Sequence, residues 1–147
     1  MNILLKKVEN DESEFYFKIR KETLRKFLIE YKPWDEESER KNMPNKINFK
    51  NDQIIYDDDK KIGLFSFNEN DANIYLDYLN LLPEYQQKGI GSSLIEKLAK
   101  KNKPIKTDTY KNNFPAIAFF KKNGFVIIGE NDKGTYPKFI LEKCNEV

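Results

Sequence analysis

The chain has 147 residues, of which 39% are hydrophobic and 34% charged, and its formal net charge is +2. This length suits one domain with a buried core, residues 1–147, and the balanced charge predicts no general attraction to nucleic acid or to a membrane. A single cysteine excludes an intrachain disulfide and a thiolate metal cage, and the lack of histidine removes the commonest general base and metal ligand. No segment is typical of an export signal or a transmembrane helix, so we expect a cytoplasmic protein.

The first third of the sequence predicts one strand and two helices. Residues 2–8 alternate loosely and favour a strand, and residues 10–14 offer helix-capping side chains. Pro33 interrupts the helical pattern that follows, and residues 34–40 predict a second, shorter helix with acids at its start. Residues 42–51 predict a loop. We expect the first helix to bury one stripe of side chains at helical spacing: Phe17, Arg20, Leu24, Phe27, Leu28 and Tyr31.

Three short apolar runs, residues 53–56, 62–67 and 74–82, are separated by Asp-rich and Asn-rich turns. This pattern predicts an antiparallel meander. Strand alternation places every second side chain of the third run on one face. That face carries Tyr75, Asp77, Leu79 and Leu81.

The third run leads into a glycine-bearing loop and then a helical pattern. Ile90, Leu94, Ile95 and Leu98 would form the apolar stripe of that helix. A strand, a tight loop and a helix N-terminus in this order favour an anion site, because unpaired backbone N–H groups and the helix dipole converge there. The loop lacks the phosphate-loop motif and the third glycine of a dinucleotide fingerprint. Its residues are Gln86, Gln87, Lys88, Gly89, Ile90, Gly91 and Ser92.

The last third predicts a strand at residues 104–110, a helix and two final strands. Asn123 and Gly124 would end the helix with a C-cap glycine. Residues 125–128 and 136–141 predict strands joined by a polar loop at residues 129–135. The fold class is therefore α/β (α+β), with a mixed, mostly antiparallel sheet flanked by helices in the order β-α-α-β-β-β-α-β-α-β-β. The helix is expected to line one face with Ala116, Phe119 and Phe120.

Two segments carry a family resemblance. The Q-x-x-G-x-G string that begins at Gln86 resembles the acyl-CoA loop of the GNAT superfamily of N-acetyltransferases. Residues 113–125 resemble that family's N-x-x-A-x-x-F-Y-x-K-x-G-F segment, in the family's order. The resemblance implies transfer of an acetyl group from acetyl-CoA to a primary amine of a small molecule or protein, directly in a ternary complex. It implies no metal, and it leaves a monomer or a homodimer open.

The resemblance also assigns binding roles. It places the CoA diphosphate on the N–H groups of residues 86–92 and the pantetheine arm along the strand edge at Leu79 and Leu81, with Asn113, Phe119 and Phe120 beside it. Ordinary core packing is the alternative for the leucine and phenylalanine side chains. Tyr31 and Trp34 would form one wall of the acceptor site unless they are core, and Tyr110 would face the acceptor groove.

Catalysis needs a proton acceptor, because freeing a lysine-like amine of its proton near neutral pH costs roughly 4–5 kcal/mol. Asp77 is the candidate base: partial burial in an apolar strand would raise its pKa. Pairing with a lysine or capping a bulge is the alternative role for Asp77, and Tyr75 could hold a water instead. Many family members have a tyrosine that protonates the leaving thiolate where this chain has Phe120. Solvent, Tyr85, Tyr110 or Tyr136 would then supply the proton, or the enzyme is slow, or the protein is an acyl-CoA-binding sensor without turnover.

Overall fold

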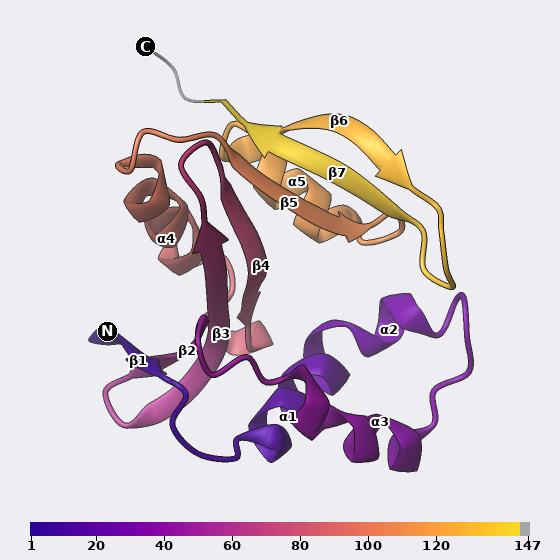
Figure 1. Cartoon of the computed structure of the whole chain (residues 1–147). Coiled ribbons are helices and arrows are strands. Elements are labelled where there is room, and N and C mark those ends of the chain that lie inside the picture. Colours follow the sequence, from indigo (N-terminus) through magenta and orange to yellow (C-terminus); the bar gives the residue numbers. More distant parts are fainter. Residues whose placement is uncertain (145–147) are drawn as a thin grey trace. The chain divides into compact units, whose positions relative to one another are not determined.

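The computed structural model describes residues 1–144 (Figure 1). Five α-helices are found in this part of the chain: α1 (Ser13–Thr23), α2 (Arg25–Leu28), α3 (Glu36–Asn42), α4 (Ile90–Ala99) and α5 (Phe114–Lys122). Two 3-10 turns accompany them, η1 (Met43–Lys46) and η2 (Pro83–Tyr85). The strands are β1 (Ile3–Lys7), β2 (Asp52–Asp57), β3 (Lys60–Glu69), β4 (Ile74–Leu81), β5 (Ile105–Tyr110), β6 (Val126–Asn131) and β7 (Lys138–Lys143).

The strands form a seven-stranded sheet with the hydrogen-bonded order β1-β2-β3-β4-β5-β7-β6. The β1–β2, β2–β3, β5–β7 and β6–β7 ladders are antiparallel, and β4 and β5 are parallel. The predicted mixed, mostly antiparallel architecture is confirmed. No helix in residues 1–144 has the length and apolar character needed to cross a membrane.

The chain divides into two compact units, one made of residues 1–67 and 78–88 and the other of residues 68–77 and 89 onwards. The first unit has a core of apolar side chains from the helices before β2 and from the first strands. Half-buried aromatic side chains, including Trp34, Tyr78 and Tyr85, pack against it. The core residues of this cluster are Val8, Phe15, Tyr16, Phe17, Ile19, Met43, Ile54, Leu64 and Leu82.

Asp52 anchors a buried polar cluster in the first unit, with only 1% of its surface exposed. Its Oδ1 accepts a 2.6 Å hydrogen bond from the Ser66 hydroxyl, and its Oδ2 accepts from the Tyr16 hydroxyl and, at 3.0 Å, from the backbone N–H of Asn48. Burial, together with the neighbouring carboxylate, raises the pKa of Tyr16 far above its ordinary value. Three donors thus balance the cost of burying the carboxylate.

The first helix is shorter than predicted. α1 ends at Thr23, whose hydroxyl donates to the Ile19 carbonyl at 2.6 Å, and the chain restarts as the one-turn helix α2 after Leu24. A threonine hydroxyl that bonds to the carbonyl four residues earlier weakens and bends a helix. The single buried stripe from residue 17 to residue 31 was therefore wrong: the buried set is Phe15, Tyr16, Phe17, Ile19 and Leu28.

The predicted second helix begins two residues later than expected. Asp35 is the N-cap of α3, and its side chain accepts from the Ser38 N–H at 3.2 Å. Trp34 therefore lies outside the helix. Side chains of α3 pair with α1, as in the 2.7 Å contact between Arg20 and Glu39. This contact explains why Arg20 lies on the expected inner stripe without being a core residue.

The second unit holds α4, α5 and β5 to β7. Ile90, Leu94, Ile95 and Leu98 are buried on α4, as predicted. Gly124 has φ +91° and donates its N–H to the Lys121 carbonyl, which confirms the predicted C-cap. Two expectations are corrected: the buried residues of α5 are Ile117 and Phe120, with Ala116 and Phe119 only half-buried, and β6 extends to Asn131 within the predicted loop.

Candidate active site

The segment after β4 is held by backbone and side-chain hydrogen bonds within the first unit. Leu82 donates its N–H to the Ile62 carbonyl at 2.9 Å, and η2 follows. Gln86 closes this turn twice: its N–H donates to the Pro83 carbonyl at 3.2 Å, and its side-chain Nε2 donates to the Leu81 carbonyl at 2.9 Å. The Gln86 side chain thus ties the loop to the end of β4, a role that the sequence did not suggest.

The chain then enters α4 through left-handed backbone. Gln87 has φ +60° and Gly89 has φ +84°. A Cβ atom at Gly89 would meet nothing within 4 Å, so the backbone conformation, not crowding, favours glycine there. Lys88, between these two residues, is exposed.

The N-terminus of α4 has no capping side chain, because its N-cap residue is Gly89. The first helical hydrogen bond runs from the Ser93 N–H to the Gly89 carbonyl at 3.0 Å. The N–H groups of Ile90, Gly91 and Ser92 precede that bond and lie outside the ladder. Aligned with the positive end of the helix dipole, they suit a phosphate group.

Gly91 has a different reason to be glycine. A Cβ atom at this position would lie 2.9 Å from Cζ of Phe119, so the phenylalanine ring of α5 packs directly on the backbone of α4. The sequence analysis placed Gly91 in the anion-binding loop and gave no packing reason for glycine at this position. The helix-to-helix contact within the second unit was missed, since no local pattern reports it.

The start of α5 and its aromatic side chains make a rigid cluster. Asn113 is 7% exposed, and its Oδ1 caps the helix by accepting from the Ala116 N–H at 3.2 Å. Phe120 is also 7% exposed and lies edge-on to Phe119, at 5.3 Å between ring centroids, and to Phe125, at 5.1 Å. The side chain at position 120 therefore has a packing role.

The candidate catalytic face of β4 lies partly in solvent. Tyr75 and Asp77 are exposed, Leu79 and Leu81 are half-buried, and the alternate residues Ile74 and Leu76 are buried. The expected partial burial of Asp77 was wrong, because the apolar character of β4 belongs to the opposite face at this end of the strand.

Asp77 has a partner that the sequence analysis missed. Nδ2 of Asn68 donates to Oδ2 of Asp77 at 2.9 Å. Asn68 is the second-last residue of β3, directly before the hairpin turn, and Asp77 lies in β4. Counting residues outward from the Asn70–Asn73 backbone hydrogen bond sets Asn68 opposite Tyr75, so Asp77 is its diagonal neighbour across the hairpin.

β4 and β5 pair only briefly. The parallel register contains two pairs, Ile74 with Ile105 and Tyr75 with Lys106. The next contact uses a side chain: the Thr107 hydroxyl donates to the Leu76 carbonyl at 3.0 Å. Over the described residues, the β4–β5 ladder therefore ends before Asp77.

The three predicted acceptor-site residues are divided between the units. In the first unit, Trp34 is half-buried, 6.3 Å from the Phe17 ring and under the Arg25 guanidinium at 5.8 Å, and Tyr31 is half-buried. In the second unit, Tyr110 lies edge-on to Tyr136 at 5.6 Å. Their joint role in binding an acceptor stays a prediction.

Comparison with known proteins identifies the family. A family model described as "Acetyltransferase (GNAT) family" matches residues 7–125. The chain belongs to the GNAT acetyltransferase family. The expected family and its transferase character are thereby confirmed.

Relatives of this GNAT protein share its fold. The Bacillus subtilis (strain 168) protein named "Putative acetyltransferase YjbC" is 37% identical over 78 residues, which are 53% of this chain and 40% of YjbC. The match thus spans less than half of that relative's length. The solution structure of apo-form YjaB from Escherichia coli has a TM-score of 0.73 at 22% identity and covers 99% of this chain and 100% of that one. The PaiA N-acetyltransferase from Thermoplasma acidophilum, in complex with coenzyme A, has a TM-score of 0.71 at 22% identity. The match covers 98% of this chain and 99% of the PaiA chain.

The GNAT fold accounts for the segments that the two sequence motifs marked. The first motif forms the uncapped entry to α4, and the second forms α5 with its Asn113 cap and C-terminal glycine. Among residues 1–144, no group of three or more acidic, histidine or cysteine side chains is arranged to hold a metal ion.

Proposed function

We propose that this GNAT protein transfers an acetyl group from acetyl-CoA to a primary amine of a small molecule or a protein, directly in a ternary complex. The observation that carries the proposal is the uncapped N-terminus of α4 directly after Gly89. It follows a strand that presents an exposed carboxylate, Asp77.

The diphosphate of acetyl-CoA suits the entry to α4. The N–H groups of Ile90, Gly91 and Ser92 offer donors outside the helical ladder, and exposed Lys88 adds a positive charge. The PaiA structure, which shares the fold, is a complex with coenzyme A, and this supports CoA as the ligand of this chain.

The pantetheine arm would follow β4 at Leu79 and Leu81. The β4–β5 register ends at Tyr75, and an extended ligand can use strand backbone groups as an added strand does. A backbone N–H of this stretch would also stabilise negative charge on the thioester oxygen. We assign Asn113, Phe119 and Phe120 to the flank of this arm.

Asp77 is the proposed proton acceptor. When bound, acetyl-CoA supplies the thioester carbonyl that the neutral amine attacks. The Asp77 carboxylate takes the ammonium proton, directly or through a water held by Tyr75, which lies on the same face of β4. Phe120 has no proton for the leaving thiolate, so solvent or the hydroxyl of Tyr85, Tyr110 or Tyr136 supplies it.

Thermal denaturation with CoA or acetyl-CoA tests the binding step. A ligand that binds only the folded state adds about 2.7 kcal/mol to the free energy of unfolding at 100 times its Kd. Gly89→Glu should abolish the rise in Tm by filling the phosphate site with a side chain of the same charge. Gly134→Glu is the matched control, since Gly134 also has a positive φ, +86°, and open surroundings. No rise for the unmodified protein at millimolar ligand would refute the proposal.

A second function, acyl-CoA binding without turnover, is favoured by one observation. Position 120 holds a phenylalanine packed between two other rings, so it offers no acid for the thiolate. A thiol-release assay over a broad panel of amines separates the two functions. Turnover of any amine that is lost in Asp77→Asn supports the enzyme, whereas CoA-induced stabilisation with no turnover supports the sensor.

A further inference from the structure

We infer that Asn68 is a positioning residue for the Asp77 carboxylate. Ion pairs of the neighbouring Glu69 with Lys101 and Lys103, called the ionic clamp below, hold Asn68 in place beside the turn between β3 and β4. The inference rests on the proposed function, in which Asp77 accepts the amine proton. It adds Asn68, from the neighbouring strand β3, to the residues of the proposed catalytic site.

The contact itself is specific. Nδ2 of Asn68 lies 2.9 Å from Oδ2 of Asp77, and both residues are exposed. An exposed carboxylate otherwise samples several rotamers in water. A donor fixed on the neighbouring strand selects one of them and makes the two carboxylate oxygens inequivalent.

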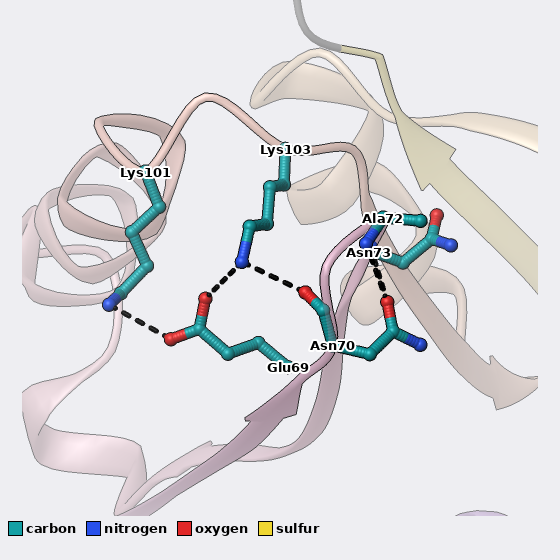
Figure 2. A network of polar contacts seen from close by, with 6 residues as sticks. All are labelled: Glu69, Asn70, Ala72, Asn73, Lys101 and Lys103. Atoms are coloured by element: carbon teal, nitrogen blue, oxygen red, sulfur yellow. Dashed lines mark hydrogen bonds and ion pairs between the residues drawn. The ribbon is translucent and has the colours of Figure 1, made fainter.

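The donor is fixed because the turn beside it is clamped. Glu69, the next residue of β3, accepts from Nζ of Lys101 at 3.1 Å and from Nζ of Lys103 at 2.9 Å (Figure 2). Hydrogen bonds from Lys103 and Lys101 lower the pKa of Glu69, so this carboxylate stays ionised at neutral pH. Successive strand residues project to opposite faces, so Glu69 can be clamped while Asn68 reaches Asp77.

The same lysine also holds the turn that follows. Nζ of Lys103 donates to the Asn70 carbonyl at 2.8 Å, and the Asn70 side chain accepts from the N–H groups of Ala72 and Asn73 at 2.8 Å each (Figure 2). Every one of these contacts lies within the second unit. These side-chain and backbone contacts together restrain the hairpin that carries Asn68.

The start of β4 is fixed independently of the lysines. The Ile74 N–H donates to the Pro104 carbonyl at 2.9 Å, and Ile74 pairs with Ile105. Asn68 and Asp77 thus lie on two segments that are each anchored to the connection between α4 and β5. A fixed distance between them follows, which is what a positioning role requires.

A double-mutant cycle tests the inference by steady-state kinetics with an amine that the protein acetylates. Asn68→Ala should lower kcat about 10-fold, the typical effect of losing a hydrogen bond to a charged group, and leave KM for acetyl-CoA unchanged. In the Asp77→Asn background the same change should have no further effect. An equal loss in both backgrounds, or no loss in either, would overturn the inference. Asn45→Ala is the matched control, an exposed amide in η1.

A readout without turnover keeps the two proposals separable. The side-chain amide resonances of Asn68 in a ¹H–¹⁵N correlation spectrum should shift in Asp77→Asn, while those of Asn45 should not. No shift at Asn68 would overturn the inference and leave the acetyltransferase proposal intact. A shift at Asn68 in a protein that binds no CoA would support the contact and refute the proposed function.

Discussion

Two aspartates of this GNAT protein show what burial does to a carboxylate. Asp52 is 1% exposed and accepts hydrogen bonds from Tyr16, Ser66 and Asn48. Asp77 is exposed, and Asn68 donates to it. The buried carboxylate has the more elaborate surroundings, yet its donors leave it closed to a substrate. The exposed one is open to solvent, as the proposed role of Asp77 as proton acceptor requires.

The largest effect should follow from Asp77→Asn. We expect kcat to fall about 100-fold or more, because general base catalysis typically contributes that much. The free energy of unfolding should stay within about 0.5 kcal/mol, as for most surface changes. Turnover assays beside urea denaturation measure both quantities. Unchanged turnover would show that Asp77 is not the proton acceptor, and the two aspartates would then no longer differ in a catalytic role.

Asp52→Ala should lower the free energy of unfolding and leave turnover unchanged, the reverse of Asp77→Asn. Removing the carboxylate leaves the hydroxyls of Tyr16 and Ser66 buried without their acceptor and also removes the bond to the Asn48 N–H, so we expect a loss of about 3 kcal/mol of stability. The kcat of the folded fraction should not change. Asp59→Asn, an exposed turn residue, is the control in the same urea titration. A stable Asp52→Ala protein with low activity would contradict a purely structural role.

Tyr16→Phe should have a smaller effect, about 1 kcal/mol, because Asp52 keeps two donors. Its pH dependence sharpens the comparison. The folded pKa of Tyr16 is raised above the unfolded value of about 10, so the stabilisation is complete below pH 10 and is lost as the pH rises beyond it. Between pH 8 and pH 11 the free energy of unfolding should therefore fall more steeply for the unmodified protein than for Tyr16→Phe. Parallel slopes would argue against a buried Tyr16–Asp52 contact.

Glu69→Gln should have the smallest effect, because it loosens the clamp without touching Asn68 or Asp77. We expect kcat to fall by less than in Asn68→Ala. The difference from the unmodified protein should shrink in high salt, since exposed ion pairs are screened. Kinetics at low and high ionic strength measure this. A loss that does not depend on salt would indicate that the charge of Glu69 is not what holds the turn.

Local periodicity predicted much of the fold. The α4 stripe, the Gly124 cap and the order of helices and strands from β2 onwards follow from spacing and turn residues, and two motifs were enough to predict the family. Periodicity could not show that Thr23 ends α1, nor which face of β4 meets solvent, because alternation separates the faces without saying which is covered. The Gly91–Phe119 contact joins residues distant in sequence, and the Asn68–Asp77 contact depends on the register of the β3–β4 hairpin, which the sequence pattern does not give. The roles assigned to the site residues remain predictions.

The ring of Phe119 against the backbone of Gly91 has a consequence for how this protein can evolve. A methyl group at position 91 would lie 2.9 Å from the ring and require it to shift, so an alanine there should be tolerated better once position 119 has become smaller. Substituting position 91 first would give a strained intermediate, in which the new side chain lies against Phe119. The two positions are thus genetically interdependent, and a mutational path through this fold has a preferred direction.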